Sequence, residues 1–474
     1  MKKSIVILLL VSIIFSAWFV SRLWIYESEM NNSGAVSQQP APNPAQTTPT
    51  PTPDPADEGP SEEELEAQRL EEERLLAEQQ AVELALRREE LLDEATLLFR
   101  GYFYDEAIAL LNADEELIDH DTLALQSEIE EAKSGLVRFE GSIKHIFFHS
   151  LILYPEALFP DLNIPTGGYN EGFIFQSEFK RILPQLLERG YVLYNINDIF
   201  SRDENGNMRQ NPIYLPPDKR PLVLSIDDPS YHYGHRLIRS GSDRIVSFDR
   251  GGRHQAGFAN RIVRDEYGEL ATEVITPQGE TIITYDGDVH VVLDAFVREN
   301  PEFSFRGHKG IIATTGYMGI FGYDLPELRD SDTRQEVIAI CDKFKENGWL
   351  FASHSYSHNR TGFWGPESNP NNIRWDTGRW KEEIEPLVGQ TNLFIAPFGY
   401  LLRGDGMQVI LDNGFDIYCI VDFNQPIDVN NNRVVMGRIE IGGYALVRWA
   451  NTLNRDFFDV AYVKDSHRPP IVSP

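Results

Sequence analysis

From about residue 142 onward, short apolar runs alternate with amphipathic segments that have a helical period. Runs rich in Ile, Leu, Val and Phe, which are typical of buried strands, span 143–149, 221–228 and 392–400. Units in which a helical period, a glycine and a second apolar run follow one another span 179–199, 334–358 and 406–421. Repeated strand–helix units predict an α/β fold with parallel strands and helices packed outside them.

Residues 234–290 interrupt this alternation. They contain polar strand-like pieces separated by turns with Asn, Gly and Pro, which are the residues that tight turns prefer. We therefore expect a β-hairpin insertion, which would lie beside the mouth of the site described below.

A different pattern precedes this domain. Residues 61–100 contain neither Gly nor Pro and are rich in Glu, Leu, Arg, Ala and Gln, which predicts a long helix. Small and aromatic residues then follow at a spacing that fits a second helix and resembles one tetratricopeptide unit. Because a solenoid needs several units, an α-helical stalk and a single tetratricopeptide-like hairpin are both open for 61–137.

The first sixty residues carry an apolar run and then a linker. Lys2 and Lys3 precede an uncharged apolar stretch at 4–21, which predicts a transmembrane signal anchor over 1–26 with a cytoplasmic N-terminus. The alternative is a cleaved signal peptide, and both interpretations place the rest of the chain outside the cytoplasm. The expected location is the cell membrane, by a single pass. Pro- and Thr-rich residues 27–60 predict a disordered linker.

Charge and cysteine content narrow the classes of partner and site. The chain has 43 Lys and Arg against 73 Asp and Glu, a formal net charge of −30. This acidity argues against nucleic acid and anionic lipid surfaces as partners. The two cysteines, Cys341 and Cys419, are too few for a thiolate metal site. The sequence allows two states for these cysteines, which are two unpaired thiols that pack in the core or a disulfide between them.

Candidate metal ligands follow two of the strand-like runs. Asp227 and Asp228 close one run, and His354 and His358 follow another. The C-terminal ends of barrel strands meet at one face, so these side chains are expected to converge. Four residues apart, the two imidazoles would face the same way on a helical turn. One aspartate with two histidines is a three-ligand set that leaves room for water, as catalytic zinc sites do. The histidine pair alone would be weak evidence, since such pairs also occur on surfaces.

Three motifs in this order resemble those of the polysaccharide deacetylases, the family that shares the NodB homology domain (carbohydrate esterase family 4). The motifs are LSIDD (224–228), SHSYSH (353–358) and APFG (396–399). The resemblance covers about residues 142–450. It implies a distorted (β/α)7-type barrel and the hydrolysis of N- or O-acetyl groups on carbohydrate polymers.

The resemblance also implies residue roles. Asp227 would be the general base, and the metal ligands would be Asp228, His354 and His358. Zn²⁺ is the expected ion, with Co, Mn and Ni as alternatives. The loop at Pro397 and Phe398 would help to bind the acetyl group and the oxyanion.

Besides Pro229, which replaces the common Gly after the aspartate pair, two departures from the family pattern concern catalytic groups. Ala396 stands at or beside the place where many members have an arginine that orients the base, and residues 437–443 lack the Leu-x-His whose histidine is the general acid. The chain is similar to circularly permuted poly-N-acetylglucosamine deacetylases, which carry that histidine at the start of the domain. His149 ends the first strand there, which implies the acid role. The alternative is a hydrogen-bonded scaffold residue.

Tyr231 and His232 follow the aspartate pair and are expected to contact substrate. The sequence thus predicts a metal-dependent hydrolase that removes acetyl groups from an extracellular or cell-wall carbohydrate polymer, with the N-acetylglucosamine type favoured. One alternative is a catalytically inactive carbohydrate-binding protein on the same fold. Another is a scaffold that binds a protein partner through its N-terminal helical module.

Overall fold

The structure is a computed structural model that describes residues 61–159, 161–163, 165–231, 237–239, 245–247 and 257–471. The predicted anchor (1–26) and linker (27–60) lie outside the described residues, and so does His232. In the part of the chain that the structure describes, every helix is too short or too polar to span a bilayer.

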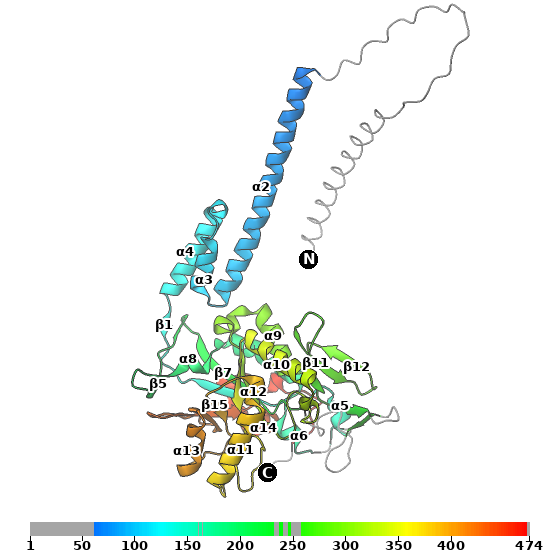
Figure 1. Cartoon of the computed structure of the whole chain (residues 1–474), viewed down its shortest axis with the longest axis vertical. Helices are drawn as coiled ribbons and strands as arrows, with labels where there is room; N and C mark the ends of the chain where they lie inside the picture. The colour runs from blue at the N-terminus through cyan, green and yellow to red at the C-terminus, as the bar shows by residue number, and fades with distance from the viewer. Residues whose placement is uncertain are drawn as a thin grey trace, which may run out of the picture. The chain divides into compact units, whose positions relative to one another are not determined.

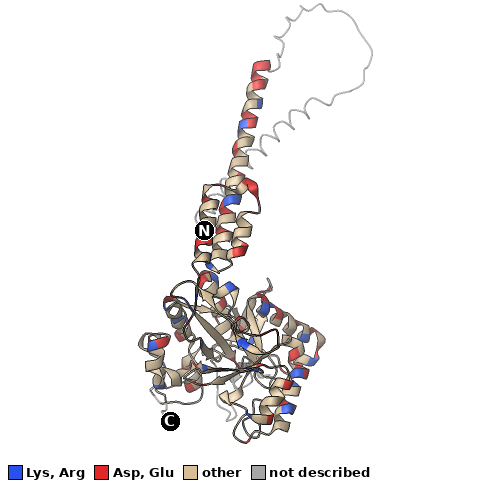
Figure 2. Ribbon diagram, turned by 90° about the vertical axis from the view of Figure 1, so that its left-hand side faces the viewer, with Lys and Arg blue, Asp and Glu red and all other residues tan. Residues whose placement is uncertain are grey.

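The chain divides into two units, residues 1–76 and 77–474. Helix α2 (Glu62–Arg100) carries Asp and Glu along much of its length (Figure 2). In the second unit, the C-terminal part of α2 shares a small apolar core with two further helices. The helical segment after α2 consists of α3 (Tyr104–Leu111), η1 (Glu115–Leu117) and α4 (His120–Ser134).

Seven parallel strands close into a barrel in the order β13-β14-β15-β16-β18-β2-β7, since β7 also pairs with β13. The strands are β2 (Lys144–Phe148), β7 (Arg220–Asp227), β13 (Gly310–Thr314), β14 (Trp349–Ser353), β15 (Leu393–Ile395), β16 (Ile417–Val421) and β18 (Val434–Glu440). This arrangement confirms the predicted α/β class and the (β/α)7-type barrel.

Two features distort the barrel. β3 (Tyr191–Leu193) pairs with the N-terminal part of β7, while β13 pairs with the C-terminal part of the same strand. β17 (Ile427–Val429) runs antiparallel to β18. The first strand, β2, pairs with the last barrel strand, β18, as Ile146 opposite Ile439. Segments nearly three hundred residues apart in the chain therefore lie side by side at this seam (Figure 1).

Helices connect and cover the strands. They are α5 (Pro155–Leu158), α6 (Tyr169–Gly172), α7 (Gln176–Glu188), α8 (Ile196–Ile199), α9 (Val289–Glu299), α10 (Ser331–Glu346), α11 (Pro370–Glu383), α12 (Glu385–Val388), α13 (Gly404–Asp412), α14 (Gly443–Arg448), α15 (Ala450–Asp456) and α16 (Val460–Val463). Short 3₁₀ turns are η2 (Pro301–Phe303), η3 (Phe305–Gly307), η4 (Glu327–Arg329) and η5 (Pro397–Gly399). Helix α11, which precedes β15, begins at Pro370, where the Asn369 side chain caps it and proline suits the first turn.

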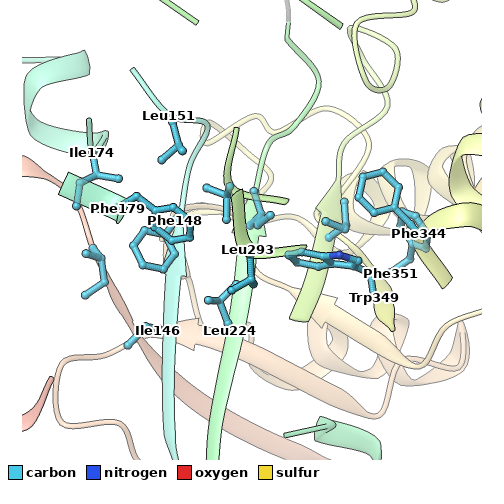
Figure 3. Close-up of a cluster of buried hydrophobic side chains, with 14 of the residues drawn as sticks. Ile146, Phe148, Leu151, Ile174, Phe179, Leu224, Leu293, Phe344, Trp349 and Phe351 are labelled. Carbon is cyan, nitrogen blue, oxygen red and sulfur yellow. The ribbon is translucent and has the colours of Figure 1, made fainter. Parts of the chain in front are cut away.

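The core has two apolar layers. One fills the space between strands and helices and includes Ile146, Phe148, Phe179, Leu224, Leu293 and Trp349 (Figure 3). The other consists of alternate strand residues that face the barrel interior, among them Val223, Ile311, Ala352, Ile395 and Met436. Cys341 and Cys419 are buried and unpaired, which settles the open question in favour of packing residues.

The insertion is larger than the single hairpin expected for 234–290. β8 (Leu237–Arg239) pairs with β9 (Ile245–Ser247), and β10 (Arg261–Arg264), β11 (Leu270–Ile275) and β12 (Thr281–Thr284) form a three-stranded antiparallel sheet. Two further small pairings are β1 (Val137–Arg138) with β6 (Tyr214–Leu215), and β4 (Phe200–Arg202) with β5 (Met208–Gln210).

Candidate active site

The candidate residues lie at the C-terminal ends of neighbouring parallel strands. Asp227 is the last residue of β7 and pairs with Ala313 of β13, which in turn pairs with Ala352 of β14. Because the three strands are in register, Asp228 and His354 emerge at almost the same height. Barrel closure thus brings side chains from distant parts of the sequence to one face.

Asp228, His354 and His358 each offer one ligand atom, and these atoms lie within 4.8 Å of one another. Asp228 Oδ2 is 3.5 Å from His358 Nε2 and 3.8 Å from His354 Nε2. His354 Nδ1 lies 2.7 Å from the Ile395 carbonyl oxygen. A carbonyl oxygen can only accept, so Nδ1 carries the proton and Nε2 is left as the ligand. One carboxylate oxygen and two imidazole nitrogens are the donors of an open zinc site, so these residues fit the ion.

The loop between the two histidines is irregular, which corrects the expected helical turn. Ser355 and His358 both have positive φ, 66° and 45°, whereas a helix needs negative φ throughout. The His358 N–H donates to Ser355 Oγ at 3.0 Å. The imidazoles nevertheless converge, with ring centroids 4.9 Å apart. The four-residue spacing therefore brings the two imidazoles together through a bent loop at the end of β14, and not through a helical turn.

Arg438 holds Asp227, and the sequence did not reveal it. Its Nη1 donates to Asp227 Oδ1 and its Nη2 to Oδ2, each at 2.7 Å. Nη1 also donates to Ser225 Oγ at 3.2 Å, and the guanidinium lies 3.9 Å from the ring centroid of Phe147. Arg438 is fully buried. The missed signal was a charged residue in the interior of a strand, VVMGRIE of β18, that is apolar from Val434 to Ile439 apart from this arginine.

Electrostatics set the protonation states of the site. Burial raises the pKa of Asp227, but Arg438 and His354 outweigh it and hold that pKa far below the ordinary range. Burial likewise raises the pKa of Asp228, while His358 and His354 bring it below its usual value. Burial lowers the pKa of His354, which the two aspartates only partly offset. An ionised carboxylate and a neutral imidazole are the forms that bind a metal ion.

His149 follows β2 at the seam with β18. Its Nδ1 donates to the Gly172 carbonyl oxygen at 3.0 Å and lies 3.5 Å from Glu440 Oε1. The ring packs against Phe173, with centroids 5.0 Å apart. Its side chain is 19% exposed, so solvent and ligands can reach it. Glu440 was a second residue that the sequence did not reveal.

Pro397 and Phe398 form the turn η5 after β15. Pro397 is buried, while Phe398 is 47% exposed and its ring centroid lies 4.5 Å from that of His358. Gly399 is required here, because its φ is +65° and a Cβ would lie 2.4 Å from the Cβ of Val421. The turn is therefore fixed against β16 and presents Phe398 beside the candidate ligands.

Tyr231 is not a substrate residue in this structure. Its side chain is 0% exposed, and its hydroxyl donates to Asp288, the N-cap of α9. The expectation that it contacts substrate is therefore wrong. His232, the other residue expected there, lies outside the described residues.

Neither a family model nor a curated protein matches the sequence. Among solved structures, the chain is similar to IcaB from Ammonifex degensii, at 13% identity and a TM-score of 0.34, over 68% of this chain and 97% of that one. It is similar to a de-N-acetylase from Aggregatibacter actinomycetemcomitans, at 11% identity and a TM-score of 0.36, over 64% and 95%. A third is the Streptococcus pyogenes deacetylase PplD in complex with acetate, at 12% identity and a TM-score of 0.33, over 66% and 98%. The motifs resemble those of deacetylases, which is what the second and third structures are named as. With identities and TM-scores this low, the function is inferred from the geometry of the site alone.

Proposed function

We propose that the chain is a metal-dependent hydrolase that removes acetyl groups from a carbohydrate polymer, with N-acetylglucosamine units as the favoured substrate. One observation carries the proposal. Asp227, paired with the buried Arg438, stands beside the trio Asp228, His354 and His358.

Asp227 is proposed as the general base. Its carboxylate stays ionised because Arg438 donates to both of its oxygens. Oδ2 lies 3.8 Å from His354 Nε2, so the carboxylate borders the ligand trio. A carboxylate with so low a pKa is a weak proton acceptor, and general base catalysis is most efficient when the pKa lies near the working pH. The attacking water must therefore be made more acidic by its surroundings.

The ligand trio would make the attacking water more acidic by binding a metal ion. When bound there, a divalent ion would act as a Lewis acid that polarises the acyl oxygen and increases the acidity of water. The chain's own contribution is to hold the carboxylate of Asp228 and the imidazoles of His354 and His358 close together, with the pKa of Asp228 and that of His354 both lowered, which favours the ionised carboxylate and the neutral imidazole that a metal needs. Backbone N–H groups near Phe398 would stabilise the developing oxyanion.

His149 is proposed as the general acid for the leaving nitrogen. Its Nδ1 is engaged by the Gly172 carbonyl, which fixes the ring and leaves Nε2 for proton transfer. Glu440 places a carboxyl group beside the ring, with Oε1 3.5 Å from Nδ1. These contacts support a positioned acid more than a bare scaffold role, because the ring is partly exposed instead of buried.

The alternative of an inactive carbohydrate-binding protein rested on two departures from the family pattern, the missing arginine and the missing acid histidine. Arg438 and His149 offer both functions from other positions in the chain. We therefore favour turnover over binding alone. Nothing in the helical module favours the scaffold alternative.

We also propose that the barrel works outside the cytoplasm, tethered by the apolar N-terminal run. The support is the sequence Lys2-Lys3 followed by the uncharged stretch 4–21.

Acetate release from acetylated glucosamine oligomers tests the proposed activity directly. We expect release by the purified protein, loss of release after chelation, and recovery when a divalent metal is added back. A metal-loaded protein that binds these oligomers without releasing acetate would favour the carbohydrate-binding alternative.

A further inference from the structure

A buried carboxylate on α11 lies against the loop that carries the two candidate histidine ligands. Asp376 Oδ1 accepts the Tyr356 N–H at 2.6 Å, and Oδ2 accepts the Ser357 N–H at 3.0 Å. Oδ2 also accepts the Ser357 hydroxyl. Asp376 is completely buried. It therefore holds two of the three residues between His354 and His358 by their backbone.

This loop depends on side chains for its shape. It is not helical, and two of its residues have positive φ, which is costly for residues other than glycine. The Ser355 N–H donates to Ser353 Oγ and the His358 N–H to Ser355 Oγ. Asp376 accepts the other two N–H groups of the loop. One carboxylate thus satisfies half of the loop's backbone donors after His354.

Asp376 has no ion-pair partner among the described residues. A buried carboxylate without a cation is costly to desolvate, and hydrogen bonds must offset that cost. Burial accordingly raises the pKa of Asp376, while the bonds from Ser357 and Tyr356 lower it in part. The bonds to this loop are therefore the main compensation for placing a carboxylate there.

We propose that Asp376 is a positioning residue for the metal site, which fixes the loop so that His358 meets Asp228 and His354. This inference rests on the proposed function, because it assumes that the trio binds a metal. Groups that orient metal ligands without touching the metal typically change metal affinity by about 10- to 100-fold when they are removed.

Metal affinity of the purified full chain tests the inference without any assay of turnover. Zn²⁺ affinity is measured by competition with a chromogenic chelator, and the Co²⁺ form is examined by its visible absorption spectrum. We expect Asp376→Ala to weaken Zn²⁺ binding about 10- to 100-fold and to change the Co²⁺ spectrum. Asp376→Asn, which retains one oxygen acceptor, should lie between this variant and the wild type.

Asp294→Asn is the matched control. Asp294 lies on α9 and accepts the Trp349 Nε1–H and the Asn347 amide on its two oxygens, each at 2.9 Å. Like Asp376, it uses both oxygens for N–H donors, but its partners lie at the start of β14 (Trp349) and just before it (Asn347), and not in the loop after the strand. We expect a lower melting temperature with an unchanged Zn²⁺ affinity and Co²⁺ spectrum.

The outcomes separate the two proposals. A finding that the wild-type protein binds no metal would refute the proposed function itself. Wild type that binds metal, with Asp376→Asn within about twofold of its affinity and an identical Co²⁺ spectrum, would overturn the positioning role alone. If Asp376→Ala does not fold, Asp376→Asn and Ser357→Ala decide the question, since Ser357→Ala removes only the hydroxyl bond to the same carboxylate.

Discussion

Arg438 of β18 donates two parallel hydrogen bonds to Asp227 of β7, each 2.7 Å long, across 211 residues of sequence. Both side chains are buried. Bidentate arginine–carboxylate pairs combine charge with a fixed geometry that a lysine cannot reproduce. The pair therefore determines both the charge and the orientation of the proposed base.

Arg438→Lys should keep the charge and lose the geometry. We expect kcat/KM for acetate release to fall on the order of a hundredfold, because small misplacements of a reacting group have effects of that size. Arg438→Met should in addition cost about 3–5 kcal/mol of stability, since Asp227 is then left buried without a partner. Steady-state kinetics and denaturant unfolding measure the two effects.

Arg468→Lys is the control for this prediction. Arg468 is also buried and donates to both oxygens of Glu178, from Nε and Nη2. It contacts neither Asp227 nor the ligand trio and, near His149, reaches only the carbonyl oxygen of Phe173, whose ring packs on His149. Its substitution should therefore lower stability and reduce kcat/KM much less than Arg438→Lys does. Equal losses of activity in the two lysine variants would contradict a specific role for Arg438.

His149→Ala should keep its metal and lose about a hundred- to ten-thousand-fold in rate on an amide substrate, the usual contribution of a positioned acid. The loss should be smaller on activated esters, whose leaving groups need little protonation. His467→Ala, which removes an exposed histidine near the C-terminus, should stay close to wild type. Full activity of His149→Ala on the amide substrate would show that another group is the general acid.

The purified protein should contain about one divalent ion per chain, as the three-ligand pattern implies. Elemental analysis of the wild type and of Asp228→Ala and His354→Ala checks this, and the variants should retain little metal. Removing the ion should also lower the melting temperature, because a ligand of the folded state stabilises it. Wild type that takes up no metal even after incubation with Zn²⁺ is the contrary result.

His290 should make stability depend on pH. It is buried on α9 against Phe344, and burial lowers its pKa to about 3. The unfolded chain takes up a proton below about pH 6.5 while the folded chain stays neutral, so stability falls as pH drops from about 6.5 toward 3. His290→Leu should reduce that slope by about 1.4 kcal/mol per pH unit.

Urea unfolding between pH 7 and pH 4 measures this slope. His120→Leu provides the control, because its side chain is 93% exposed and its removal should leave the slope unchanged. An unchanged slope in His290→Leu would show that His290 is already protonated, or solvated, in the folded state.

The N-terminal run should export the barrel. A reporter that is active only outside the cytoplasm, fused after residue 60, is expected to be active, because the lysines before the apolar stretch favour a cytoplasmic N-terminus. N-terminal sequencing of the mature protein then separates an intact anchor from a signal peptide cleaved near residue 18. Activity of a cytoplasm-only reporter at the same position would reverse the assignment.

Much of this protein could be predicted because local pattern controls it. Apolar runs and helical periods indicated the parallel α/β barrel, and the ends of those runs indicated Asp227, Asp228, His354 and His358. A (β/α)7-type barrel implies that its first and last strands meet, and β2 does pair with β18. Patterns of this kind are local, since each depends on the spacing of neighbours within one element.

The tertiary structure alone determined which further side chains meet the candidate site. Arg438 reaches Asp227 only because closure sets β18 beside β2 and β2 beside β7. Tyr231 and Phe398 are both aromatic residues close to motifs, yet one is fully buried on Asp288 and the other is half exposed beside His358. Asp376 joined the site through packing of α11 against a loop that precedes it in the chain. Such contacts depend on which segments barrel closure brings together, and no local spacing encodes them.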